Sequence, residues 1–439
     1  MSARQTTGSL PGLGADAGGR SGRDAVRLAR AALTRLVEPG DETALAVVDV
    51  LGPEHALAVL TGRCRPTREQ EDALAECSGS PDTWRRRFSA GLRRWGPRSD
   101  ALAPERDLVA LHRLGGGLLV PEDPAWPACL DDLGHRRPLA LWTRGSAILP
   151  EHPRTLAVVG SREATAYGRA VTGRLVAPLA AEGVTVLSGG AYGIDGAAHR
   201  VALEAGRGTP PTLAVLAGGL DRFYPAGHEE LLRAVMDRGL LLSEMPPGAS
   251  PTRHRFLHRN RIIAALAAGV LVVEARWRSG AQNTASHALG LGRELGVVPG
   301  PITSPSSAGC HRLLAETPAR LIAHLDDARG LLPAGAGPGP APAPGPGAPD
   351  GRGGVGHGAA GQDPYARPED GLSEQELLVF DALPVRSHAA LDRLAVAAGM
   401  PVPPLVAVLQ RLARAGLAEE RDRRWRRGPR AAVRGAQGG

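Results

Sequence analysis

The sequence predicts an α/β protein whose central part is a mostly parallel sheet covered by helices on both faces. Between residues 156 and 332, short apolar runs alternate with helical patterns. The runs "LAVVG", "VTVLSGG", "TLAVLAGG", "LLLSE", "VLVVEA" and "LGVVPG" are almost continuous in apolar residues, as in strands that are buried on both faces. Glycine turns follow several of these runs, at the end of the strands where such sheets bind ligands.

The composition favours an acidic partner and several domains. The chain has 439 residues and a formal net charge of +7. All of its 52 basic residues are arginine, so no lysine is available as a Schiff-base nucleophile or a P-loop cation. Coding bias is the simplest origin of this composition, but forked guanidinium groups also suit phosphate.

The N-terminal part predicts a small helical domain. We expect residues 1–23 to be disordered and a helical domain to occupy residues 24–115, since apolar residues there recur at helical spacing. The segment "VPEDPAWPACLDDLGHRRPLALWTRG" is interrupted by prolines and reads as a connector, and the sheet domain is expected over residues 116–332.

The C-terminal part predicts a linker and a second small domain. Residues 333–370 are rich in Pro, Gly and Ala, a composition typical of a flexible linker. Residues 371–430 contain Ser373 and Glu376 at capping-box spacing, three helical segments and the basic hairpin-like "LAEERDRRWRRG". This order resembles a winged helix.

No sequence feature predicts a metal site, a disulfide framework or a membrane span. The four cysteines lie far apart, without a C-x-x-C pair. The longest uncharged apolar run, residues 262–273, is too short to cross a bilayer, and the first residues lack the apolar core of a signal peptide. We therefore expect a soluble, cytoplasmic protein.

The first glycine turn, "VVGSREATAYGRA", predicts a phosphate contact. Backbone amides of Gly160 and Ser161 at a helix start would form an anion site, and Arg162 would reach the same phosphate. A purely structural turn is the alternative. The fingerprint G-x-G-x-x-G is absent, so no dinucleotide cofactor is expected.

The second turn, "LSGGAYGIDGAAH", places Gly189, Gly190 and Gly193 where positive φ and close approach of a ligand are needed. Asp195 is expected to cap the helix that begins at Ile194. Asp195 and His199 could instead form a general-base pair, but capping and packing explain both residues more simply.

Two further segments carry cations and aromatic rings. "AGGLDRFYPAGHEEL" brings Arg222 and Tyr224 to a third glycine turn. Tyr192 lies in the second turn, and such tyrosines suit base stacking beside phosphate contacts. "TRHRFLHRNRII" places Arg259 and Arg261 near a helix start, which predicts an anionic partner; buried polar structure that braces the neighbouring turns is the alternative.

In order and spacing, "VVGSR", "LSGGAYGIDGAAH", "AVLAGGLDRFYP", "LLLSEMPPG", "RNRII", "VLVVEA" and "SSAGCHRLL" resemble the DNA-processing protein A (DprA/Smf) family over about residues 105–330. The resemblance implies a Rossmann-like domain flanked by a helical domain of the SAM or HhH type and by a winged helix. It implies a homodimer that binds single-stranded DNA, protects incoming strands in natural transformation and helps to load a RecA-type recombinase. The implied DNA site comprises Gly160, Ser161 and Arg162, the turn from Gly190 to Ile194, and the loop from Asp221 to Tyr224.

The chain departs from the family pattern at several positions. Tyr192 stands where members commonly carry arginine, and His228 stands where an asparagine follows the Tyr-Pro loop. The segment Phe256-Leu257-His258 replaces a Phe-Pro pair before Arg259.

An enzyme resembling the LOG-type phosphoribohydrolases is the alternative function. Those enzymes carry the motif P-G-G-x-G-T-x-x-E, and here "SGAQNTASH" places His287 where the glutamate would stand. Because the carboxylate that would stabilise an oxocarbenium-like transition state is missing, we expect a binding protein without catalytic residues, cofactor or metal.

Overall fold

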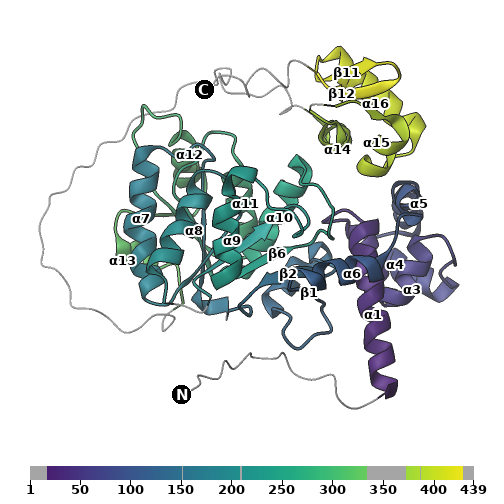
Figure 1. The fold of residues 1–439 in the computed structure, drawn as a ribbon, viewed down its shortest axis with the longest axis horizontal. Coiled ribbons are helices and arrows are strands. Elements are labelled where there is room, and N and C mark those ends of the chain that lie inside the picture. The colour runs from purple at the N-terminus through teal and green to yellow at the C-terminus, as the bar shows by residue number, and fades with distance from the viewer. Residues whose placement is uncertain (1–16, 151, 208–209, 334–371, 386, 429–439) are drawn as a thin grey trace, which may run out of the picture.

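The computed structural model describes residues 17–150, 152–207, 210–333, 372–385 and 387–428. The described part consists, in chain order, of a helical region, a sheet with its covering helices, and a compact C-terminal region (Figure 1). The expected disorder of residues 1–16 and the expected linker over 334–370 lie outside the described residues.

The N-terminal region is helical, as predicted from its apolar spacing. Its helices are α1 (Ala17–Leu36), α2 (Glu42–Leu51), α3 (Pro53–Leu60), α4 (Arg68–Cys77), α5 (Pro81–Ser99) and α6 (Pro104–Arg113). Helix α1 therefore begins before residue 24, where the helical domain was expected to start. Asp41 caps α2, and Thr67 and Gln70 form a capping box on α4, so these helix starts follow local sequence signals.

The central sheet has nine strands in the order β1-β2-β6-β5-β4-β3-β7-β8-β9. The strands are β1 (Gly116–Leu119), β2 (Leu141–Gly145), β3 (Thr155–Val159), β4 (Thr185–Ser188), β5 (Thr212–Leu216), β6 (Leu240–Ser243), β7 (Gly269–Val272), β8 (Glu294–Val297) and β9 (Arg320–Leu321). The seven neighbouring strands β6-β5-β4-β3-β7-β8-β9 pair in parallel. Strand β2 pairs antiparallel with both β1 and β6. The predicted mostly parallel, Rossmann-like sheet is thus confirmed.

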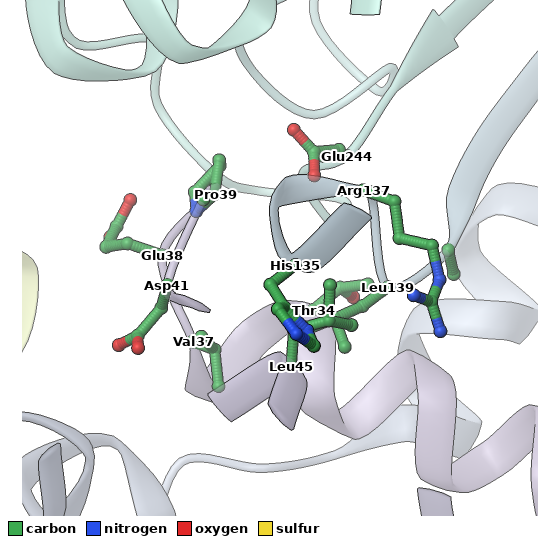
Figure 2. A pocket seen from close by; sticks show the side chains of 12 residues that line it. Thr34, Val37, Glu38, Pro39, Asp41, Leu45, His135, Arg137, Leu139 and Glu244 are labelled. Atoms are coloured by element: carbon green, nitrogen blue, oxygen red, sulfur yellow. The ribbon is translucent and has the colours of Figure 1, made fainter. Parts of the chain in front are cut away.

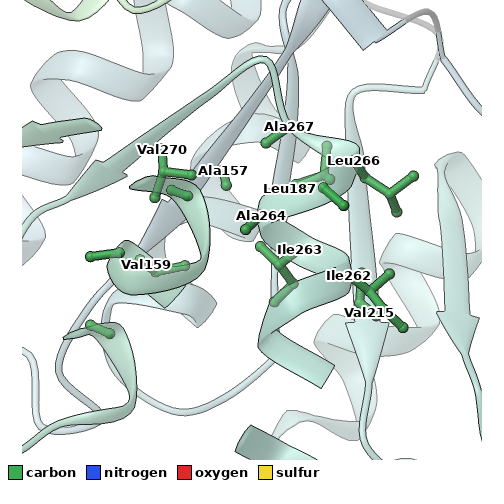
Figure 3. Close-up of a cluster of buried hydrophobic side chains, with 14 of the residues drawn as sticks. Ala157, Val159, Leu187, Val215, Ile262, Ile263, Ala264, Leu266, Ala267 and Val270 are labelled. Carbon is green, nitrogen blue, oxygen red and sulfur yellow. The ribbon is translucent and has the colours of Figure 1, made fainter. Parts of the chain in front are cut away.

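Successive residues of each strand pack on opposite faces, which explains the almost continuous apolar runs. Ala157 and Val159 of β3 contact one buried cluster, to which α10 contributes Ile262 and Ile263 (Figure 3), whereas Leu156 and Val158 contact another. The first face is covered by the 3₁₀ segment η1 (Ala128–Arg136), α10 (Arg253–Leu266), α11 (Gly280–Gly290) and α12 (Ala308–Glu316). The opposite face is covered by α7 (Ala166–Ala181), α8 (Ile194–Ala205), α9 (Glu229–Arg238) and α13 (Leu325–Arg329). Two short 3₁₀ turns, η2 (His152–Arg154) and η3 (Ala226–His228), lie in the connections.

The segment interpreted as a connector is more ordered than expected. It contains η1 and β2, and Trp142 of β2 is fully buried, with its indole N–H donated to Thr34 Oγ1 of α1 at 3.1 Å. Leu130 and Leu133 of η1 belong to the sheet core. The prolines therefore delimit short elements here instead of preventing them.

The C-terminal region has the element order expected of a winged helix. It comprises α14 (Glu374–Ala382), β10 (Ala389–Ala390), α15 (Leu391–Ala398), α16 (Val402–Arg414), β11 (Ala418–Arg421) and β12 (Arg424–Arg427). Ser373 and Glu376 form the predicted capping box, and the positive φ of Asp422 and Arg423 closes the basic hairpin. Helix α14 lies against α10, and α15 lies against α5 (Figure 1).

Within the described ranges, no single helix is long and apolar enough to cross a membrane. The bent pair α15 and α16 reaches the required length and composition only when both helices are counted together.

Candidate functional site

The three predicted glycine turns lie side by side. Strands β3, β4 and β5 are neighbours and run parallel, so the turns at Gly160, Gly189 and Gly218 share one edge of the sheet. Helix α10 crosses beneath this edge, because Arg259 reaches carbonyl groups of Gly189 and Val215. The candidate site is therefore the carboxyl edge of β3 to β5 together with the first turns of α10.

The turn after β3 is fixed by backbone contacts that the sequence did not predict. Ser161 is buried, its amide donates to Glu274 O at 2.7 Å, and its carbonyl accepts from Ile194 N at 3.1 Å. The Ser161 amide is therefore not free for a phosphate, and α7 begins only at Ala166. The expected anion site at the amides of Gly160 and Ser161 is therefore wrong for Ser161. The segment is a structural turn that presents Arg162.

The turn after β4 is closed by Asp195. Its carboxylate accepts hydrogen bonds from the amides of Gly189 (3.1 Å) and Ala191 (3.4 Å), upstream of α8. The helix itself starts at a glycine N-cap, Gly193, without a side-chain cap. Asp195 thus ties the turn to the helix instead of capping it, and burial raises its pKa against the opposing charge of Arg259.

Glycine is required at position 193. Its φ is +80°, and a Cβ there would lie 2.1 Å from Ser161 O. The first two turns are thus in direct contact, which no residue pattern showed.

His199 is a packing residue. It is fully buried and its Nδ1 lies 2.7 Å from Thr212 Oγ1, while burial lowers the pKa of the imidazole to about 3. Because Asp195 bonds amides and His199 bonds Thr212, the two do not form a general-base pair. The packing role expected as the simpler alternative is correct for His199, whereas the expected capping role of Asp195 is wrong, because the carboxylate bonds amides upstream of α8.

Tyr192 is held in place with its ring at the surface. The side chain is 46% exposed, and its hydroxyl accepts a hydrogen bond from Gly227 N at 3.1 Å. Its ring and the imidazole of His228 meet edge to face at a centroid distance of 4.7 Å, and His228 Nδ1 lies 3.1 Å from Gly190 O. The two departures from the family pattern, Tyr192 and His228, are therefore in contact.

Phe256 is the site residue that sequence reasoning missed. From the first half of α10, its ring lies 4.8 Å below the guanidinium of Arg162 and 5.7 Å from the ring of Tyr224. Tyr224 is 51% exposed and Arg162 is exposed. A sequence signal for Phe256 does exist, because it is the one Phe, Tyr or Trp in the basic stretch "TRHRFLHRNR". The arginines of this stretch suggested a role in binding, and the ring between them did not.

The turn after β5 presents one further cation. The side chain of Arg222 is 88% exposed, with Asp221 at 3.8 Å. Asp221 also accepts from Gly248 N at 2.7 Å, which links this loop to the segment after β6. Tyr167 lies apart from this group, since its hydroxyl donates to Pro299 O beyond β8.

Arg259 and Arg261 are placed inside the protein, not on its surface. Arg259 is 6% exposed, it donates to Gly189 O at 2.8 Å and to Asn260 Oδ1, and burial lowers its pKa to about 10. Arg261 is 1% exposed and forms a two-bonded ion pair with Glu244. The prediction that they contact an anionic partner is corrected to the alternative, in which they brace the neighbouring turns.

In the part of the chain that is described, no three potential metal ligands lie together so that they could hold a metal ion. His287, which stands where the hydrolase motif has glutamate, has its pKa lowered to about 4 by burial. A neutral imidazole cannot replace the negative charge of that carboxylate.

A cavity lined by several charged side chains lies between the helical region and the sheet (Figure 2). Its acids are Glu38, Asp41 and Glu244. Asp41 pairs with Arg94, Glu244 pairs with Arg261, and Glu38 pairs with both Arg98 and Arg255. This cavity joins two parts of the molecule and is not a ligand site of the sheet edge.

The fold and the sheet edge together define a class of protein: a Rossmann-like α/β protein with a cationic and aromatic surface at its strand ends. The model of the family described as DNA recombination-mediator protein A matches residues 117–332. A DNA processing protein DprA of Mycobacterium tuberculosis is 43% identical over 392 residues, which cover 84% of this chain and 93% of that protein. The chain belongs to the DNA recombination-mediator protein A family.

Other relatives match smaller parts of the chain. The DNA processing protein DprA of Streptococcus pneumoniae is 39% identical over 194 residues, 44% of this chain and 67% of that protein. The crystal structure of DNA processing protein A from Streptococcus pneumoniae covers 70% of this chain and 98% of its own, with a TM-score of 0.53 and 28% identity. The resemblance seen in the sequence is confirmed, and its relatives are DNA processing proteins.

Proposed function

We propose that this protein binds single-stranded DNA at the carboxyl edge of β3 to β5 and catalyses no reaction there. The observation that carries the proposal is the surface of Arg162, Tyr192, Arg222, Tyr224 and Phe256, in which cations alternate with partly exposed aromatic rings. Base stacking beside phosphate contacts is the usual arrangement for sequence-independent binding of single strands.

Each group has a definite part in this mechanism. Arg162 and Arg222 contact successive phosphates, and the rings of Tyr192 and Tyr224 accept unpaired bases of any sequence. The backbone of Gly189, Gly190, Gly193 and Ile194 shapes the turn that carries Tyr192. In a duplex the bases are stacked on each other, so the rings favour single strands.

Family membership supports the biological part of this proposal. The protein protects incoming single strands and helps to load a RecA-type recombinase in DNA-mediated transformation or recombination, acting as a homodimer. Assembly of recombinase filaments on strands coated with a single-strand-binding protein, followed with and without this protein, tests the loading. Light scattering of the purified chain tests the dimer.

Substitution of Arg162 tests the site. Its guanidinium is exposed and makes no ion pair among the described residues, so Arg162→Ala removes a phosphate contact without exposing a buried charge. We expect single-stranded DNA to bind about five- to tenfold more weakly, and the slope of log K against log salt to fall by about 0.7. Fluorescence anisotropy with a labelled oligonucleotide measures both.

Arg174→Ala is the matched control, since Arg174 is an exposed arginine of the neighbouring helix α7, away from the turns. Equal affinity of the parent protein and the Arg162→Ala variant at moderate salt would show that the site is wrongly placed. Release of free base from purine monophosphates at enzyme-like rates would instead favour the hydrolase alternative.

A further inference from the structure

Glu274 is a buried carboxylate that the DNA-binding surface does not use. It lies two residues after the end of β7, is 2% exposed, and forms no ion pair with any described cation. Its Oε2 accepts from Thr165 N at 3.0 Å and its Oε1 accepts from Thr165 Oγ1 at 2.5 Å. Thr165 is the N-cap of α7, so the negative charge sits at the positive end of a helix of 16 residues.

The surroundings of Glu274 are shaped to this carboxylate. A Cβ at Gly168, in the first turn of α7, would lie 2.2 Å from Glu274 Oε2, so that position leaves room only for glycine. The backbone oxygen of Glu274 accepts from Ser161 N, which holds the turn that presents Arg162. One residue therefore fixes both the start of α7 and the loop before it.

Glu274 lies at the point of the sheet where the strand order reverses. The chain order reverses between β3 and β7, because β3 continues to β4 on one side whereas β7 continues to β8 on the other. In open parallel sheets this is the crevice where small ligands bind, with their phosphates at a helix N-terminus. Here a carboxylate of the protein already occupies that N-terminus.

We infer that Glu274 is a built-in anion that excludes free phosphates and nucleoside monophosphates from the β3–β7 crevice and positions the Arg162 loop for a polymer. It is a specificity-determining and positioning residue. Its exclusion of phosphate stands on the geometry alone, whereas its effect on DNA rests on the proposed function.

Removal of the carboxylate tests the exclusion. In Glu274→Ser the crevice gains space and the N-terminus of α7 loses its anion, so inorganic phosphate and 5′-AMP should bind at least about tenfold more tightly than to the parent protein. Isothermal titration calorimetry of the full chain measures this. Glu294→Ser is the control, because Glu294 starts β8 at the opposite end of the neighbouring strand.

A double-mutant cycle tests the positioning. Glu274→Gln keeps the side-chain volume but replaces one of the two acceptor oxygens with a donor. It therefore weakens the contacts to Thr165, which ends the Arg162 loop, and leaves the backbone bond from Ser161 N in place. We expect about a threefold loss of affinity for single-stranded DNA, and no further loss when Glu274→Gln is added to Arg162→Ala. A residue that only stabilises the fold would lower the melting temperature and leave this coupling at zero.

The outcomes separate the inference from the proposed function. Phosphate binding gained by a folded Glu274→Ser variant supports the exclusion even if the parent protein fails to bind DNA. Equal phosphate binding by the parent and the variant overturns it. If Glu274→Ser does not fold, the cycle with Glu274→Gln decides, and additive losses with Arg162→Ala overturn the positioning.

Discussion

Tyr192 and His228 illustrate how single residues set the character of the candidate interface. The Tyr192 hydroxyl accepts from Gly227 N, and the His228 ring packs edge to face with the tyrosine ring while its Nδ1 contacts Gly190 O. The aromatic face is thereby fixed at the surface before a ligand arrives, which reduces the entropy lost on binding. At this position the chain offers a stacking surface where the family commonly offers a charge.

Substitutions of Tyr192 should separate stacking from charge. Tyr192→Ala should weaken binding of single-stranded DNA by about 1–3 kcal/mol, the usual contribution of one stacked base. Tyr192→Phe keeps the ring and loses only the hydroxyl contact with Gly227, so its affinity should stay within about threefold of the parent. Titrations of oligonucleotides containing 2-aminopurine report the stacking directly by fluorescence quenching.

Tyr192→Arg should recover affinity at low salt and steepen the salt dependence, because a phosphate contact then replaces a stacked base. Equal losses in Tyr192→Phe and Tyr192→Ala would show that the hydroxyl, not the ring, carries the interaction.

At the scale of elements, the strands were predicted well where both faces are buried. The six runs that became β3 to β8 consist of apolar residues because helices cover both sides of the sheet. Strands β1, β2 and β9 escaped prediction for physical reasons. The first contains two glycines, the second follows a proline-rich segment, and both residues of β9 are exposed at the sheet edge.

The candidate site was predicted in part. The glycine turns follow from local backbone requirements, which a sequence displays directly. Whether an arginine is exposed depends instead on acceptors supplied by distant elements. Arg259 finds carbonyl groups of Gly189 and Val215, and Arg261 finds Glu244, so neither burial could be deduced from the helix that carries them.

The packing of α8 predicts a pH dependence of stability. Burial lowers the pKa of His199 to about 3, and the charges of His228, Arg259 and Arg200 act in the same direction. In the unfolded chain His199 takes up a proton as the pH falls below about 6.5, whereas in the folded protein it stays neutral until about pH 3. The stability due to neutral His199 is therefore complete above pH 6.5 and is lost as the pH falls below it.

Urea unfolding between pH 7 and pH 5 measures this effect. We expect His199 to contribute a slope of up to about 1.4 kcal/mol per pH unit at the acid end of this range, and His199→Gln to show a shallower dependence than the parent. Burial of His287 acts with the same sign in both proteins, so the difference between them isolates His199. Parallel curves for the two proteins would contradict the assignment.

At the scale of the whole molecule, a buried charge cluster joins all three regions. Arg98 of α5 donates to Glu38 at 2.6 Å and to the carbonyl groups of Val396 (3.4 Å) and Ala397 (3.5 Å) at the end of α15. Glu38 also pairs with Arg255 of α10. Although burial opposes it, the charges of Arg255 and Arg98 hold the pKa of Glu38 well below its usual range.

The same cluster places the C-terminal region beside the candidate interface. Arg255 directly precedes Phe256, and the cation of Arg98 lies at the negative end of the α15 dipole. Gly399 ends α15 with a φ of +61°, and a Cβ there would lie 2.7 Å from the Arg98 guanidinium. The contact between α5 and α15 therefore uses Arg98 and the small residue Gly399. These residues come from regions about 300 residues apart in the sequence.

Arg98→Ala should release the C-terminal region from the helical region. The variant loses the two carbonyl contacts, while Arg255 still neutralises Glu38, so we expect docking to weaken by about 1–3 kcal/mol without global unfolding. Hydrogen–deuterium exchange at residues 391–400 should accelerate by about five- to a hundredfold if the docked contact protects them. Arg94→Ala is the control, because Arg94 lies on the same helix and its guanidinium pairs with Asp41 of the helical region. Unchanged exchange in the Arg98→Ala variant would mean that the packing of α14 on α10 alone holds the C-terminal region in place.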